Sequence, residues 1–229
     1  GRCLTLERYP VSQDANLQAW DATDEYLMQE LAPWLSDAST ATVLIFNDGF
    51  GALSCALHAC NPVSISDSFL SQEATRRNLL ANGLAVESVT LLGSLDPLPA
   101  VPALAVIKIP KTLALLEQQL LALRQVVTPQ TRILAGGKTR EIHNSTLALF
   151  EQILGPTKTS LAWKKSRLIH TQVVERPALA NPYPTIWELD DSGYRIHNHA
   201  NVFSRGSLDI GARLFMAHLP SGLEGTIAD

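Results

Sequence analysis

The sequence predicts an α/β fold with a doubly wound, mainly parallel sheet that an antiparallel hairpin closes. From Thr42 onward, short apolar segments of strand character alternate with longer segments of helical spacing, which favours parallel strands joined by helices. After Gly155-Pro156 the alternation stops. Residues 157–174 then hold two β-rich runs around Lys164-Lys165-Ser166, which is the pattern of a hairpin. At 229 residues, the chain is long enough for one sizeable core and an appendage.

The elements of this fold follow in chain order. Residues 4–9 alternate like a short edge strand ended by Pro10, and residues 21–35 space their apolar side chains as a helix does. The alternating part predicts strands at 43–46, 63–66, 88–92, 103–107 and 132–135, with helices at 51–60, 71–81, 112–126 and 144–154.

A second segment follows a proline-rich connector. Residues 177–184 contain three prolines and show no period, so we interpret them as the boundary between a domain of residues 1–176 and a segment of residues 177–229. In that segment, residues 185–197 predict a hairpin across Asp190-Asp191-Ser192-Gly193. Residues 209–219 predict an amphipathic helix, and residues 222–229 predict the start of a new strand.

A glycine turn, Asn47-Asp48-Gly49-Phe50-Gly51, connects the strand at 43–46 to the helix that begins at Ala52. A strand, a glycine turn and a helix start in this order let backbone N–H groups and a helix dipole face a ligand. Asp67 ends the next strand, where an acid would hold a ribose hydroxyl.

The same turn lacks part of a cofactor site. The closing hairpin favours the class I methyltransferase arrangement, because an oxidoreductase-type Rossmann fold would continue with another helix-linked parallel strand. In a cofactor-binding domain of the methyltransferase type, an acid would stand at Ile45 and the first glycine at Asn47. We therefore predict a degenerate cofactor site in which Gly49, Gly51 and Asp67 are vestiges.

The fourth strand ends without the residues for amine methylation. A methyltransferase that modifies an exocyclic amine ends this strand in Asn-Pro-Pro followed by an aromatic residue, which accept hydrogen bonds from the amine and stack on the flipped base. Here Ile109, Pro110, Lys111 and Thr112 stand at those positions. Ile109 cannot accept a hydrogen bond and Thr112 offers no stacking face, so we expect no catalytic residue in residues 1–176.

The charge distribution indicates a basic middle region. Residues 1–100 carry 4 Lys/Arg against 12 Asp/Glu, residues 101–176 carry 11 against 4, and residues 177–229 carry 3 against 6. Strand ends share one edge of a doubly wound sheet, so basic residues after the fourth and fifth strands should meet there, although the hairpin tip need not join them. Such a patch suits RNA phosphates, and a merely solvated surface is the alternative. The candidate RNA-binding residues are Lys108, Lys111, Lys138, Arg140, Lys164, Lys165 and Arg167.

Other residue types exclude several classes of protein. Cys3, Cys55 and Cys60 lack the spacing of a disulfide framework or a zinc site, so we expect reduced thiols. His197-Asn198-His199 resembles half of a metal site, but no further ligand is spaced to complete it, and we expect no metal. No run approaches the roughly 18 apolar residues that cross a bilayer, and no signal peptide opens the chain. We therefore expect a cytoplasmic protein with no membrane partner.

Two segments near the end of the chain resemble a known family. Residues 202–213 and residues 224–229 are similar to the segment that leads into the catalytic domain of two-domain bacterial ribosomal RNA guanine-N2 methyltransferases. In that family, the acid at the position of Asp229 opens the cofactor motif Asp-x-Gly-x-Gly-x-Gly. Residues 112–123, 142–146, 161–165 and 197–205 look most similar to the member that modifies large-subunit (23S) rRNA, and the resemblance spans nearly the whole chain.

The resemblance implies two methyltransferase-like domains in tandem. The C-terminal copy binds S-adenosylmethionine and methylates guanine N2, whereas the N-terminal copy has lost cofactor binding and assists rRNA recognition and folding. Because the sequence ends at Asp229, we expect it to lack the catalytic domain, and we expect ribosomal RNA and that domain as its partners. Two alternatives stay open: weak S-adenosylmethionine binding through Gly49, Gly51 and Asp67, or a purely structural role in docking onto the catalytic half.

Overall fold

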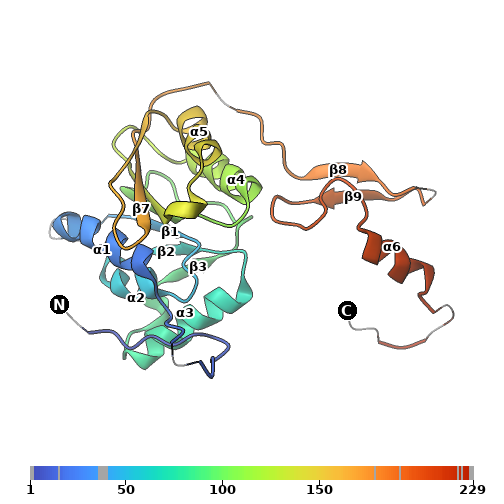
Figure 1. The fold of residues 1–229 in the computed structure, drawn as a ribbon, viewed down its shortest axis with the longest axis horizontal. Helices are drawn as coiled ribbons and strands as arrows, with labels where there is room; N and C mark the ends of the chain where they lie inside the picture. The colour runs from blue at the N-terminus through green and yellow to red at the C-terminus, as the bar shows by residue number, and fades with distance from the viewer. Residues whose placement is uncertain are drawn as a thin grey trace. The chain divides into compact units, whose positions relative to one another are not determined.

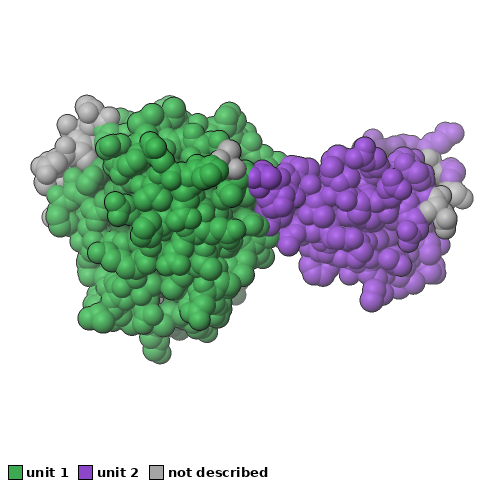
Figure 2. Space-filling model, turned by 90° about the horizontal axis from the view of Figure 1, so that it is seen from above, with its two compact units in different colours: residues 1–179 green, residues 180–229 purple. Residues whose placement is uncertain are grey.

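The computed structural model describes residues 3–14, 16–35, 41–177, 179–190, 192–220, 222 and 224–226. The chain folds as two compact units, residues 1–179 and residues 180–229, which Figure 2 colours separately. The assignment of residues 1–176 and 177–229 to separate domains stays a prediction. No helix in the described ranges is both long and apolar enough to cross a membrane.

A seven-stranded sheet forms the centre of the first unit (Figure 1). Its strand order is β3-β2-β1-β4-β5-β7-β6; the first five strands are parallel, and β7 runs antiparallel to both β5 and β6. The predicted α/β fold with a closing hairpin is therefore confirmed. The strands are β1 (Val43–Phe46), β2 (Val63–Ile65), β3 (Thr90–Leu92), β4 (Leu104–Lys108), β5 (Arg132–Lys138), β6 (Thr157–Thr159) and β7 (Ser166–Thr171).

Alternate residues of the central strands pack into different clusters. In β1, Leu44 and Phe46 belong to one buried apolar cluster, while Val43 and Ile45 belong to another. This alternation follows from the two-residue period of a strand. Because both clusters are apolar, β1 and β4 read in the sequence as nearly continuous apolar runs.

Helices lie between the strands as the sequence predicts, with small differences at their ends. Ser68 and Thr112 cap α3 and α4 through side-chain oxygens that accept hydrogen bonds from the backbone N–H groups of Ser71 and Leu115. The helix predicted at 51–60 is two elements, α2 and a 3₁₀ turn, because the chain reaches a left-handed Asn61 before Pro62. The helical elements are α1 (Ala22–Leu35), α2 (Ala52–Ala56), η1 (His58–Cys60), α3 (Phe69–Ala81), η2 (Val86–Ser88), α4 (Leu113–Arg124), η3 (Thr139–Glu141) and α5 (Asn144–Ile153).

The strand predicted at residues 4–9 was wrong, because this segment pairs with a helix rather than with a sheet. The N–H and C=O of Thr5 bond to the side-chain amide of Asn82 at 2.9 and 2.7 Å. The N–H and C=O of Glu7 bond in the same way to the amide of Asn78, at 2.9 Å each. Two side-chain amides on α3 thus satisfy the alternate backbone groups that a neighbouring strand would satisfy.

The second unit consists of a hairpin and a helix. Strands β8 (Thr185–Glu188) and β9 (Arg195–Asn198) pair antiparallel, and α6 (Ile210–Ala217) begins after Asp209, whose carboxylate accepts a hydrogen bond from the N–H of Ala212 at 3.2 Å. The predicted strand at 222–229 is absent from its described positions, Gly222 and residues 224–226. Its remaining positions, including Asp229, lie outside the described residues.

Candidate functional site

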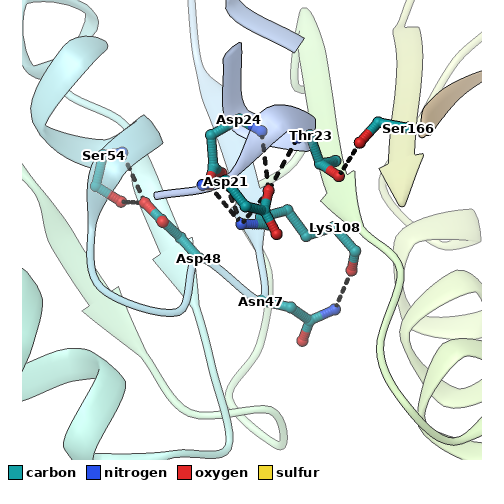
Figure 3. Close-up of polar contacts among 8 residues, drawn as sticks. All are labelled: Asp21, Thr23, Asp24, Asn47, Asp48, Ser54, Lys108 and Ser166. Atoms are coloured by element: carbon teal, nitrogen blue, oxygen red, sulfur yellow. Dashed lines mark hydrogen bonds and ion pairs between the residues drawn. The ribbon is translucent and has the colours of Figure 1, made fainter. Parts of the chain in front are cut away.

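The carboxyl ends of β1 and β4 meet at the point where the strand order reverses. Open α/β sheets bind ligands in the crevice at such a point. Three parts of the chain supply polar groups to this crevice: the glycine turn after β1, the end of β4, and the first turn of α1. Figure 3 shows these groups together.

The two glycines of the turn differ in what surrounds them. Gly51 has a φ of 81°, and a Cβ there would lie 2.7 Å from the Cα of Thr75, so only glycine fits. At Gly49, by contrast, a Cβ would meet nothing within 4 Å. Asp67 is exposed after β2. The fixed part of the turn is therefore the part that packs against α3.

An amide pair occupies one side of the crevice. Asn47 has a φ of 63°, a left-handed conformation that asparagine tolerates better than most residues. Its side-chain N–H groups donate to the carbonyl of Lys108 at 2.8 Å and to Oε1 of Gln119 at 2.9 Å. The amide of Gln119 donates back to Oδ1 of Asn47 at 2.8 Å. The residue at the expected position of the first glycine therefore ties β1 to β4 and α4.

A buried ion pair occupies the other side (Figure 3). The ammonium of Lys108 lies 2.7 and 2.8 Å from the two carboxylate oxygens of Asp24 and 3.8 Å from the carboxylate of Asp21. The side chains of Lys108 and Asp24 are only 19% and 5% exposed. Next to Asp24 in the chain, Thr23 shares a hydrogen bond of 3.0 Å with Ser166 of β7. These contacts fix the first turn of α1 over the ends of β4 and β7.

Burial and charge shift the pKa values of this cluster. Burial raises the pKa of Asp24 to about 6; Lys108 opposes this shift, and the nearby Asp48 adds to it. Burial alone would lower the pKa of Lys108, but the attraction of Asp24, Asp21 and Asp48 outweighs it and raises that pKa above its ordinary value. Asp48 is itself buried. One of its oxygens accepts hydrogen bonds from the N–H and hydroxyl of Ser54 at 2.8 Å, and the other has no hydrogen-bond partner among the described residues.

A cavity of about 400 Å³ opens beside this cluster, between the ends of β4 and β5. Lys108, Lys111 and Lys138 all line it, so three of the four basic residues expected at the sheet edge do meet there. Arg140 is exposed in η3, two residues after Lys138. A second cavity of about 390 Å³ shares Asp21, Lys108 and Lys138 with the first and reaches Gly49 and Arg8.

The tip of the β6–β7 hairpin joins the same edge. The carbonyl of Lys165 accepts hydrogen bonds from the N–H of Thr139 at 2.8 Å and from its hydroxyl at 3.1 Å. Trp163 and Ser166 bond to each other through both backbone groups at 2.8 Å, closing a two-residue turn. Both central residues, Lys164 and Lys165, have positive φ values of 45° and 63°. Such a turn ordinarily contains Asn and Gly.

Not all of the predicted basic residues present a free charge. Lys108 is held by Asp24, and Lys164 forms an ion pair of 2.7 Å with Glu25 on α1. In the described ranges, no ion pair is made by Lys111, Lys138, Arg140, Lys165 or Arg167. Arg167 pairs across the sheet with Gly137 and is half-buried. The unpaired cations therefore follow the β5–β7 side of the edge.

The sequence analysis missed the residues that fill the crevice. Gln119 and Asp24 are buried polar residues on helices whose neighbouring positions are apolar. Asp24 shares the buried face of α1 with Leu27 and Leu31, at i+3 and i+7. A carboxylate at that spacing on an apolar face was the available signal that it needs a buried cation.

The described ranges contain no group of three or more His, Cys, Asp or Glu side chains that could hold a metal ion. The acids of the crevice surround an ammonium instead. Cys3, Cys55 and Cys60 are free thiols, and burial raises the pKa of Cys55 to about 12. A thiol of this kind is unreactive at neutral pH.

Comparison with protein families places this chain. The model of the RLMG N-terminal domain matches residues 1–175. The chain belongs to this family. The resemblance to the N-terminal domain of the 23S rRNA member is thereby confirmed.

Curated relatives agree over the whole chain. It is 62% identical to the ribosomal RNA large subunit methyltransferase G of Klebsiella pneumoniae and 60% identical to that of Pectobacterium atrosepticum, over 100% and 99% of its length. It covers 60% and 59% of those relatives. The chain thus spans about three fifths of the length of the relatives it matches.

Solved structures share the fold. The 16S rRNA N2 G1207 methyltransferase (RsmC) of T. thermophilus, in complex with AdoMet and guanosine, aligns over 93% of this chain and 54% of its own, with a TM-score of 0.64 and 17% identity. A putative SAM-dependent methyltransferase from Streptococcus mutans aligns over 71% and 52%, with a TM-score of 0.53 and 12% identity. At these identities, the likeness establishes the class I methyltransferase fold.

Proposed function

We propose that this chain is the RNA-facing, non-catalytic domain of an S-adenosylmethionine-dependent 23S rRNA guanine-N2 methyltransferase. In this proposal, the cofactor and the methyl transfer belong to a C-terminal catalytic domain, and the present chain helps to bind rRNA and to fold its partner domain. The observation that carries the proposal is the division of the sheet edge into a filled crevice and an open, basic side. The protein would act in the cytoplasm, where ribosomal RNA is modified.

The filled crevice supports the absence of catalysis. Asn47 and Gln119 close one side and Lys108 and Asp24 the other, so a cofactor would have to displace two satisfied polar pairs. Separating a buried ion pair costs several kcal/mol. The end of β4 provides Ile109 and Thr112, which can neither accept hydrogen bonds from an exocyclic amine in the required place nor stack on a base.

The open side supports RNA binding. Lys111, Lys138, Arg140 and Lys165 are exposed cations from the β4–α4 connection, β5, η3 and the hairpin tip. Each phosphate contact made by such a cation releases counterions and adds to the salt dependence of binding. Lys164 and Lys165 also hold backbone conformations that disfavour lysine, and strain of this kind tends to persist at functional positions.

A salt titration tests the proposal. The variant K111Q/K138Q/R140Q/K165Q should bind 23S rRNA more weakly, and the slope of log K against log salt should fall by about 3, since each lost contact removes roughly 0.7 to 0.9. A control with the same charge change, R76Q/K158Q/R176Q/R195Q, removes basic residues elsewhere on the chain and should keep the wild-type slope. An unchanged slope in the first variant would favour the structural docking role.

Calorimetry tests the remaining alternative. Gly49 has open space around it and Asp67 is exposed, which are the observations that favour residual cofactor binding. Titration of the 229-residue chain with S-adenosylmethionine should show no heat of binding. Saturable binding that Asp67→Ala abolishes would overturn the non-catalytic assignment.

A further inference from the structure

The cavity between β4 and β5 has an apolar floor built from backbone and aliphatic side chains. Ile109, Pro110 and Leu113 supply the side chains, and Gly136 and Gly137 supply bare backbone. A Cβ at Gly137 would lie 3.2 Å from the Cβ of Ile109, and a Cβ at Gly136 would lie 3.0 Å from Thr23. Side chains at these positions would crowd the residues that line the cavity.

The rim of the cavity is charged. Lys111 and Lys138 are exposed, and neither forms an ion pair with a described residue. Asp21 lies on the inner wall, where its carboxylate is already near Lys108. A carboxylate acceptor inside and two ammonium groups at the mouth suit a ligand that carries N–H groups at one end and a negative charge at the other.

We propose that this cavity binds one unpaired ribonucleotide of RNA, with its base against the apolar floor and its phosphate between Lys111 and Lys138. The inference rests on the proposed function and adds a ligand and a place. A volume of about 400 Å³ lies in the range of small-ligand sites. Proteins that recognise RNA sequences mostly do so through single-stranded nucleotides whose bases are splayed out into pockets.

The surroundings of the cavity fit a continuing RNA strand. On one side, Lys165 adjoins Thr139 and so places a further cation next to Lys138. On the other side, the second cavity shares Lys138 and ends at Arg8, whose guanidinium lies 4.7 Å from the ring centre of Phe50. Cations therefore flank the site along the direction that neighbouring phosphates would follow, which a free mononucleotide would not need.

Nuclear magnetic resonance tests the site on the unmodified chain. Addition of a ten-nucleotide single-stranded RNA should shift the backbone amides of Ile109, Leu113, Gly136 and Gly137. The same RNA folded into a fully paired hairpin should shift them less. Shifts confined to residues outside the cavity would overturn the proposal, as would shifts produced by S-adenosylmethionine and not by RNA.

A variant that fills the cavity tests the site independently. Leu113 lines it and is 44% exposed, so Leu113→Trp should reduce the volume without changing charge or burying a polar group. RNA affinity should fall roughly tenfold, the scale of losing one stacked base, while the salt slope stays at its wild-type value. Leu80→Trp, on exposed α3, is the matched control and should bind like the wild type.

The outcomes separate this inference from the proposed function. Wild-type RNA affinity in Leu113→Trp, together with a reduced salt slope in K111Q/K138Q/R140Q/K165Q, would overturn the cavity and leave the RNA-binding face in place. Wild-type behaviour in both variants would overturn both. Urea unfolding and circular dichroism of Leu113→Trp exclude misfolding as the cause of a loss, and the amide shifts of the unmodified chain do not depend on any variant.

Discussion

The two sides of the sheet edge use similar residues for opposite purposes. On the β1–β4 side, Asn47, Asp24 and Lys108 are satisfied by partners from the same chain. On the β4–β5–β7 side, Lys111 and Lys138 line an open cavity and form no ion pair with a described residue. One side is therefore part of the core of the protein, and the other side is available to a partner.

The difference shows what the loss of a ligand does to a binding edge. A crevice left empty exposes polar groups that need partners, and the cheapest partners are other polar groups nearby. Here α1 contributes the carboxylates and α4 contributes the amide. Substitutions on the first side should therefore change stability, and substitutions on the second side should change binding.

The largest effect is expected from Lys108→Met. Removing the ammonium leaves Asp24 buried without its partner, which typically destabilises a protein by about 3 to 5 kcal/mol. Urea unfolding measures the loss, and the salt slope of RNA binding at low denaturant should stay unchanged. The double variant K108M/D24L removes both charges and should recover most of the stability. A stable Lys108→Met with a reduced salt slope would return this lysine to the RNA-binding set.

The two glycines of the turn should differ strongly in their response to alanine. Gly51→Ala combines a left-handed φ with a Cβ 2.7 Å from the backbone of Thr75, and should cost about 2 to 4 kcal/mol. Gly49→Ala meets nothing within 4 Å and should change stability by less than about 0.5 kcal/mol. Thermal unfolding of both variants gives the comparison. Equal losses would contradict the view that only Gly51 is fixed by packing.

The pH dependence of stability should reveal Asp24. Its pKa is raised to about 6 in the folded protein, so the folded state binds a proton more tightly than the unfolded state between about pH 4 and pH 6. The stability that Asp24 contributes is therefore present below about pH 4 and is lost as the pH rises to about 6. At 1.36 kcal/mol per pKa unit, the loss is at most about 3 kcal/mol.

Carbon NMR of the Asp24 carboxyl group measures this pKa directly. Because Lys108 lowers the pKa and Asp48 raises it, Lys108→Met should move the midpoint upward and Asp48→Asn should move it downward. Shifts in the opposite directions would mean that the charges around Asp24 are not those of the ion-paired cluster.

Local patterns in the sequence predicted most of the fold. The strand at 43–46 and the helix start at Ala52 were correct because apolar runs, glycine turns and caps are local signals. The segment at residues 4–9 was misread because its alternation is that of an extended chain, whatever its partner. The partner, Asn78 and Asn82 on α3, lies more than 70 residues away.

The candidate site was less predictable than the fold. Spacing placed Lys108, Lys111 and Lys138 at one edge, and they do line one cavity. It could not show that acids from the first turn of α1 would neutralise Lys108 and Lys164, since those acids lie 84 and 139 residues away. A count of charges along the sequence therefore overstates the free positive charge of this edge.

The smallest effect is expected at Lys165, and it separates strain from charge. Lys165 holds a φ of 63° in a turn that favours glycine at this position, so Lys165→Gly should stabilise the chain by about 1 kcal/mol. The backbone bonds from Thr139 to its carbonyl remain. The same variant should lower the salt slope of RNA binding by roughly 0.7 to 0.9, because one cation is lost. Lys165→Ala removes the charge but keeps the strain, so it should lower the slope equally without gaining stability. If Lys165→Gly gains no stability, the turn is not strained; if Lys165→Ala binds RNA like the wild type, the strain serves something other than a phosphate contact.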